Sequence, residues 1–156
     1  MGAVYTATMA QNVTLDGLGR VGLWIGDSPD NYLQKLLRLT VTMDDAGDSN
    51  EKRYLISLMH TAAAPTGTSV VPTPHSTGAS AYPAGAIRKD GNYYFAAKAT
   101  NVAFSSLTGW LWQPTTPEQF IWGGSPSKHL AITLTGGSDS EVRYIESSLT
   151  FEVFGG

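Results

Sequence analysis

The chain of 156 residues contains no cysteine, few charges and no long apolar run. Without cysteine there is no disulfide framework, no thiolate zinc site and no cysteine nucleophile. Charged residues make up 15% of the chain, compared with about 25% in typical soluble proteins. The ten basic residues are scattered rather than clustered, and no apolar run is long enough for a secretory signal or a membrane-spanning helix. We therefore expect no direct nucleic-acid partner and no membrane partner.

Motifs for catalysis and metal binding are also missing. The sequence has no G-x-S-x-G, no P-loop and no H-E-x-x-H, and His60, His75 and His129 lack the i, i+4 spacing of a helical zinc site. The acidic stretch from Asp44 to Glu51, "DDAGDSNE", clusters the oxygen ligands that Ca²⁺ prefers but lacks the EF-hand order, and we interpret it as a solvated hairpin turn. We predict that the protein is not an enzyme and that it uses no cofactor and no metal.

Ser, Thr and Gly are abundant, with 48 of the 156 positions between them. A helical protein makes its surface soluble with Glu and Lys, whereas a sheet protein can use Thr and Ser. Alternation of apolar and polar residues with period two predicts strands at 3–13, 34–44 and 144–154, and further strands are expected at 19–27, 52–61, 92–99, 108–114 and 128–135. In 34–44, the alternation predicts that Leu37, Leu39, Val41 and Met43 share one face. The fold class predicted is all-β: an antiparallel β-sandwich or jelly roll with long Pro/Gly/Ser/Thr-rich loops.

We expect one β domain over residues 1–156, in which 1–32 forms an N-terminal arm or extra strands and 61–87 forms a long extended loop. The stretch "GTSVVPTPHSTGASAYPAGA", from Gly67 to Ala86, contains three prolines, three glycines and no Asp, Glu, Lys or Arg. Because proline withholds amide donors, this stretch cannot be a central strand. We predict that it reaches away from its own domain as an extended arm, with help from residues 113–126; a disordered loop is the alternative.

Two tryptophans in "GWLWQP" suggest another kind of site. In a strand, Trp110 and Trp112 would share a face about 6.6 Å apart, which could form a platform for stacking sugar rings. Alternatively, tryptophans such as these fill a core or a subunit interface.

The order of several segments resembles that of known phage proteins. These are "LLRLTVTMDDAGDSNEKRYLISLMH", the Gly67–Ala86 stretch, "GWLWQPTTPEQFIW", "SKHLAITLT" and "SLTFEVF". Over roughly Leu36 to Phe154 this order resembles a group of small structural proteins of tailed bacteriophages, found among head genes. The resemblance implies a decoration (cement) protein on the capsid exterior, made in the host cytoplasm. It also implies that the major capsid protein is its partner and that it forms a trimer or another symmetric homo-oligomer.

If the protein is a decoration protein, we expect its uncharged, proline-bearing loops to contact the capsid or neighbouring subunits. The predicted contact residues are Val70, Val71, Pro72, Pro74, Tyr82, Pro83, Pro114 and Pro117. Two other functions are considered: a carbohydrate-binding or receptor-binding β-sandwich module of a phage tail, which would use Trp110 and Trp112, and a major coat protein that forms the shell itself. The segment from Met1 to Gly19 contains no Lys or Arg, whereas a shell-forming coat more often carries a basic arm for nucleic acid.

Overall fold

A computed structural model describes residues 2–15, 20–27, 32–43, 53–61, 67–89, 100–105, 110–112, 120–124, 129–136 and 141–154. Within these ranges, the side chains of residues 20, 53–55, 100–105, 110–112 and 135–136 are outside the description. All regular structure in the described part of the chain is β-strand. That part contains no helix that could cross a membrane.

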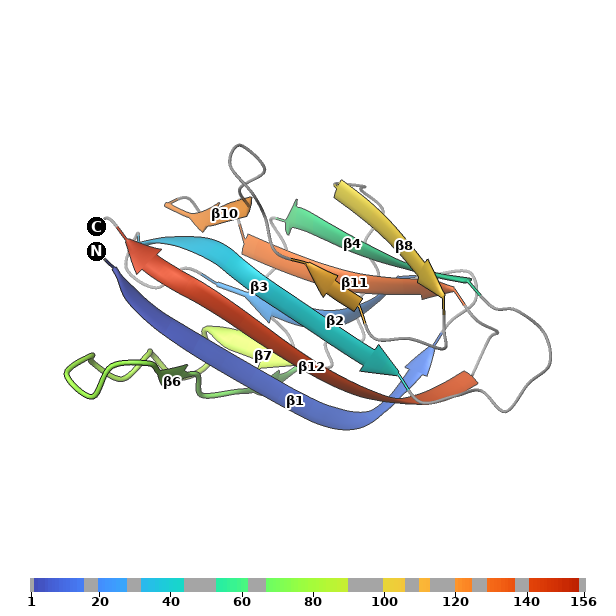
Figure 1. Ribbon diagram of the computed structural model, residues 1–156, viewed down its shortest axis with the longest axis horizontal. Helices are drawn as coiled ribbons and strands as arrows, with labels where there is room; N and C mark the ends of the chain where they lie inside the picture. Colours follow the sequence, from blue (N-terminus) through green and yellow to red (C-terminus); the bar gives the residue numbers. More distant parts are fainter. Residues whose placement is uncertain are drawn as a thin grey trace.

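The strands form two six-stranded antiparallel sheets that pack as a sandwich, which confirms the predicted fold class (Figure 1). In sheet A the order is β10 (Phe120–Gly123), β3 (Leu33–Met43), β12 (Glu141–Phe154), β1 (Ala3–Leu15) and β6 (Thr73–Pro74), and β9 (Trp110–Trp112) also pairs with β3. In sheet B the order is β5 (Thr68–Ser69), β7 (Ile87–Lys89), β2 (Arg20–Gly26), β11 (His129–Gly136), β4 (Arg53–Thr61) and β8 (Thr100–Ser105).

The first and last strands of the chain lie side by side in sheet A. They pair without a register shift from Ala3 opposite Val153 to Leu15 opposite Glu141. Residues 1–32 therefore supply two integral strands, β1 and β2, and the two ends of the chain lie at the same end of the sandwich (Figure 1).

Alternation along β12 places every second side chain in the core, as the sequence predicts. Ile145, Leu149 and Phe151 are fully buried between the sheets. At Ser147 the same face carries a hydroxyl, which accepts a hydrogen bond from the indole Nε1 of Trp24 across the sandwich at 2.9 Å and donates one to the carbonyl of Thr40 at 2.7 Å. The small polar residue thus satisfies the buried indole donor.

The predicted alternation along β3 is wrong at one position. Arg38 pairs with Thr150 and Leu36 with Phe151, so Leu37 is an extra residue without a partner in β12, as in a β-bulge. The bulge changes the phase of the strand. Leu36 and Gln34 are therefore fully buried, while Leu37 is only half-buried.

Sheet B is buried on both faces near its centre. Adjacent residues of β4, from Ile56 to Met59, are all buried, and so are those of β11 from Leu130 to Leu134. The strand predicted at 52–61 is thus β4, which lies between β11 and β8, and its nearly continuous apolar run matches its burial on both faces.

The two long loops of the sequence contain strands that the patterns did not predict. Strand β10 lies within 113–127, and β5, β6 and the start of β7 lie within 61–87. They are two to four residues long, too short for a period-two pattern to be recognised. The strand expected at 92–99 lies outside the described residues, and β8 follows it directly.

Candidate functional site

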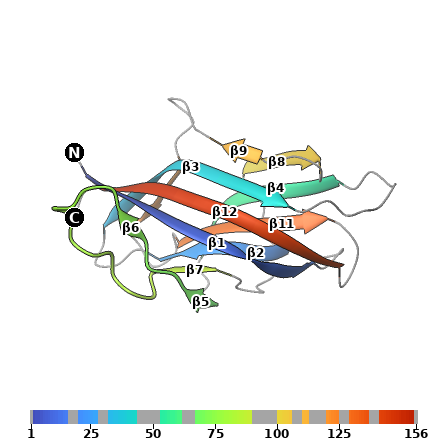
Figure 2. The same cartoon turned by 60° about the horizontal axis from the view of Figure 1, so that its bottom comes forward.

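Residues 67–86, here called the surface segment, lie against the sandwich instead of reaching away from it (Figure 2). Strand β6 pairs with Tyr5 and Thr6 at the edge of sheet A, and β5 pairs with β7 at the edge of sheet B. The prediction of an extended arm is therefore wrong. Pro74 is tolerated because it sits at an edge, where a missing amide donor interrupts no central ladder.

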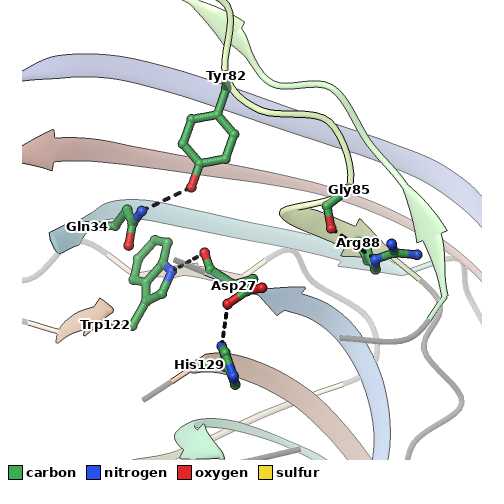
Figure 3. Close-up of polar contacts among 7 residues, drawn as sticks. All are labelled: Asp27, Gln34, Tyr82, Gly85, Arg88, Trp122 and His129. Atoms are coloured by element: carbon green, nitrogen blue, oxygen red, sulfur yellow. Dashed lines mark hydrogen bonds and ion pairs between the residues drawn. The ribbon is translucent and has the colours of Figure 1, made fainter. Parts of the chain in front are cut away.

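Tyr82 anchors the surface segment in the core. Its side chain is buried, and its ring centroid lies 5.2 Å from that of Tyr5 and 5.1 Å from that of Phe151. Gln34 Nε2 donates a hydrogen bond to the Tyr82 hydroxyl at 3.1 Å (Figure 3). Burial raises the pKa of Tyr82 above its usual range, so the phenol stays neutral at physiological pH.

Hydrogen bonds to main-chain carbonyls hold the rest of the segment. The hydroxyl of Tyr5 donates to the carbonyl of Ser80 at 2.8 Å, the amide of His75 donates to the carbonyl of Val4 at 2.9 Å, and the amide of Val70 donates to the carbonyl of Ile87 at 2.8 Å. The Nε2 atom of His75 also lies 2.7 Å from the Thr6 hydroxyl. The segment is thus tied to both sheets along its length.

Arg88 closes the base of the surface segment (Figure 3). Its Nε donates to the carbonyl of Gly85 at 2.9 Å, and its Nη1 donates to the carbonyl of Gly67 at 3.0 Å. Gly85 has a φ of 83°, a backbone conformation that favours glycine, and its amide donates to the hydroxyl of Ser69 at 3.0 Å. Arg88 is not among the site residues predicted from the sequence. Its signal was its position as the first charged residue after Gly67.

Beside the segment, Asp27 at the end of β2 joins three elements (Figure 3). Its amide donates to the carbonyl of Ala86 at 2.7 Å, and its carbonyl accepts from the indole Nε1 of Trp122 at 3.3 Å. Its carboxylate Oδ1 lies 2.7 Å from His129 Nδ1, an ion-pair distance when the imidazole is protonated. These contacts fix the end of β2 between β10 and the surface segment.

The other two histidines lie elsewhere. His60 contacts the carbonyl of Ile121 and stacks on Phe120, and His75 contacts Thr6. Within the described ranges, no group of three or more His, Asp or Glu side chains could hold a metal ion. The acidic stretch from Asp44 to Glu51 lies outside those ranges.

The predicted contact residues divide into four groups. Val71 and Pro83 are exposed, and Val70 and Pro74 are half-buried. Pro72 and Tyr82 are buried against their own protomer, so they support the segment and do not present a surface. Pro114 and Pro117 lie outside the described residues.

The exposed side of the surface segment is uncharged. It consists of thirteen residues: Gly67, Thr68, Ser69, Val71, Thr73, His75, Ser76, Thr77, Gly78, Ser80, Ala81, Pro83 and Ala84. None of them is Lys, Arg, Asp or Glu. Val71 is 64% exposed and is one of the few large apolar side chains on the described surface. This set of side chains is the candidate contact surface.

The outer face of sheet A carries hydroxyls that pair between strands. The hydroxyls of Thr6 and Thr150 lie 2.8 Å apart, and those of Thr40 and Ser148 lie 2.6 Å apart. An open depression of about 430 Å³ is lined by Thr8, Met9, Ala10, Thr40, Thr42, Lys89, Glu146, Ser147 and Ser148. Small polar side chains therefore cover much of this face.

The tryptophans predicted to form a sugar platform lie on β9, where Trp110 pairs with Val41 and Trp112 with Leu39. Their side chains are outside the described part of the structure. Trp24 and Trp122 are fully buried and belong to the core. The sugar platform stays a prediction.

In comparisons with known proteins, no family model, no curated protein and no solved structure matches the chain.

Proposed function

We propose that the protein is a structural component of a bacteriophage virion. It binds the outer surface of the icosahedral capsid, has the major capsid protein as its partner, and stabilises the head by bridging neighbouring subunits. The observation that carries this proposal is the surface segment, whose exposed residues carry no formal charge while its backbone is fixed on both sheets.

An uncharged surface favours binding to protein. Lys, Glu and Asp are depleted from the centres of protein interfaces because they are costly to desolvate and immobilise. The exposed Thr, Ser, Ala and Pro side chains of the segment lose little rotamer entropy on contact. Val71 supplies exposed apolar area on this surface.

The fixed backbone favours binding for a second reason. A loop that is already ordered pays no further ordering entropy when it meets its partner. Tyr82, Arg88 and the β6 pairing provide that order within the protomer. The segment would thus act as a preformed contact surface, not as an arm that folds on binding.

The test is binding to heads assembled from the major capsid protein alone, measured by co-sedimentation. Val71→Asp places a charge in the proposed contact surface, and we expect at least a tenfold loss of affinity. Val142→Asp is the matched control, because Val142 is similarly exposed (56%) but lies on β12, away from the surface segment.

Two results would count against the proposal. One is the absence of any binding of the wild-type chain to such heads. The other is an equal loss for both variants, which would indicate a general effect of the added charge. Closed particles formed by the chain on its own would favour the shell-forming alternative.

A further inference from the structure

Among the described residues, most of the β1 edge of sheet A has no strand partner. Strand β6 pairs only with Tyr5 and Thr6, whereas β1 continues to Leu15 and pairs with β12 throughout on its other side. No other described strand pairs with this edge, as the ribbon also shows (Figure 2). Ala7–Leu15, here called the open edge, therefore lacks a strand partner among the described residues.

The backbone direction of the open edge follows from its contact with the surface segment. The amide of His75 donates to the carbonyl of Val4, so Val4 directs its main-chain groups toward this side. Main-chain groups alternate along a strand, and the pairing of β1 with β12 has no register shift. Thr8, Ala10, Asn12 and Thr14 therefore direct their N–H and C=O groups out of the sheet.

The residues of the open edge do not themselves block another strand, and the charged side chain beside them is Lys89 of β7, which lines the same depression as Thr8, Met9 and Ala10. Natural sheets protect their edges with Lys, Pro, inward-pointing charges or bulges. The open edge reads "ATMAQNVTL", with no charged residue and no proline, and its ladder to β12 is regular. An uncharged edge of this kind can accept a strand through main-chain hydrogen bonds.

Gln11, at the middle of the open edge, has a polar atom that needs a partner. It lies on the core-facing side of β1 with Met9 and Val13. Its amide nitrogen Nε2 is buried and has no hydrogen-bond partner among the described residues. A buried donor without an acceptor destabilises the fold, because it has lost its hydrogen bond to water.

We propose that the open edge pairs with the open edge of a second copy of this chain, antiparallel, with a two-fold axis at Gln11. In this register Ala10 faces Asn12 of the partner subunit, and Thr8 faces Thr14 of the partner subunit. The outward main-chain groups of both copies then meet in four pairs that exchange two hydrogen bonds each, about eight bonds in all. In this register the core-facing residues of one β1 strand lie opposite the core-facing residues of the other. The two A sheets therefore join into one continuous sheet with its core side on the same face throughout.

The same register provides the missing acceptor. The two Gln11 residues face each other as a non-hydrogen-bonded pair, the kind whose side chains approach most closely. Once each side-chain amide rotates toward the axis, its Nε2, which is enclosed in the single chain, can donate to the Oε1 of Gln11 of the partner subunit. No residue of either open edge is charged, so no like charges from the paired β1 strands meet across the axis. This inference rests on β1 alone and does not depend on capsid binding.

The experiment measures the mass of the purified full chain by light scattering and sedimentation over a dilution series. We expect a dimer, with twice the 16.6 kDa of one chain. Gln11→Glu and Gln11→Lys place like charges opposite each other at the axis, so each variant alone should lose the dimer. An equimolar mixture should recover it as a heterodimer, which a variant that fails to fold cannot do.

Asn12→Pro is a second probe, because it removes an outward amide and leaves the β12 ladder its donors. It should also yield monomer, whereas Thr42→Glu, on the exposed face of β3, should leave the dimer intact. A wild-type monomer, a trimer, or a dimer that persists in both Gln11 variants would overturn the proposal.

Discussion

Tyr82 is the side chain on which the surface segment depends. It brings an aromatic ring from an otherwise polar segment into the core, against Tyr5 and Phe151. Tyr82→Ala should lower the free energy of unfolding by about 3–5 kcal/mol, the usual cost of removing a buried aromatic ring. Tyr82→Phe keeps the packing and loses the hydrogen bond from Gln34, so we expect about 1–3 kcal/mol. Urea unfolding measures both, and equal stability of Tyr82→Ala and wild type would contradict the burial of this ring.

Glu152 makes the pairing of the chain ends sensitive to acid. Partial burial acts to raise the pKa of its carboxyl, but hydrogen bonds from the Gly2 amide and from Lys35, with the positive charge of Lys35, outweigh it and lower the pKa. Because the pKa of Glu152 is lower in the folded than in the unfolded protein, its ionised carboxylate stabilises the fold at pH values above the unfolded-state pKa of about 4.3. This stabilisation is lost as the pH falls through the folded-state pKa. Glu152→Gln should therefore be less stable than wild type at pH 7, by up to about 1 kcal/mol for this partly exposed pair.

The measurement for Glu152 is thermal unfolding of both proteins from pH 7 down to pH 2. The difference between them should shrink below pH 4 and be absent at pH 2. Lys35→Gln provides a parallel variant, because it removes the cation and keeps the carboxyl. A difference that stays constant over the whole range would mean that the Glu152 charge contributes nothing.

Strands in which apolar and polar residues alternate over many positions could be predicted from the sequence. The strands of two to four residues in the two long loops, which are recognised only by their pairing with a neighbour, could not. The alternation that predicted a strand at 144–154 matches the burial along β12, where Ile145 and Leu149 lie in the core. The face predicted for Leu37 in β3 was wrong, because the position of a bulge depends on the register with the neighbouring strand. The alternation of apolar and polar residues does not reveal that register. Burial of Gln34 was missed for the same reason.

The candidate site was only partly predictable. Its location at Gly67–Ala86 followed from the uncharged, proline-bearing composition. Its conformation did not, because it depends on the fit of Tyr82 between Tyr5 and Phe151, which come from the two ends of the chain. Composition indicated that the segment was unusual, and tertiary packing decided that it lies on the sandwich.

The bulge in β3 predicts an unusual tolerance to deletion. Removing Leu37 leaves Arg38 opposite Thr150 and Leu36 opposite Phe151, so the strand becomes regular and no other side chain changes face. The loss should be limited to the half-buried Leu37 side chain, below about 2 kcal/mol. Urea unfolding should stay cooperative.

Deletion of Thr40 is the matched control for the bulge. Between the deletion and the bulge at Leu37, each residue of β3 moves by one position in its register with β12. A shift of one position reverses the face of a side chain, so Arg38 turns toward the core and Leu39 toward the outer face. An unpaired charge in the core is strongly destabilising, and we expect loss of cooperative unfolding. If both deletions were equally harmful, the register at Leu37 would be wrong.

The three functions considered for the chain differ in what each assay would detect. Capsid attachment requires binding to preformed heads, and a shell-forming coat would assemble closed particles by itself. A tail module would give a signal on a glycan array, and Trp112→Ala should abolish it if the tryptophans of β9 form the platform. These readouts are independent, so a positive result in one does not mask the others.

Pairing of β12 with both β1 and β3 makes the folding of sheet A depend on the C-terminal strand of the domain. Strand β12 lies between β3 and β1, and Leu149 and Phe151 are fully buried. Truncation after Ser148 removes both side chains, and each loss should lower the free energy of unfolding by about 2–5 kcal/mol. It also removes the part of β12 that pairs with the first half of β1. Together these losses approach or exceed the total stability of a typical domain, about 5–15 kcal/mol. We expect no cooperative unfolding transition in the fluorescence of Trp24 and Trp122, whereas truncation after Phe154 should unfold like wild type. A cooperative transition in the shorter chain would show that the remaining strands fold without β12, and the core between the sheets could not then depend on the pairing of the first and last strands.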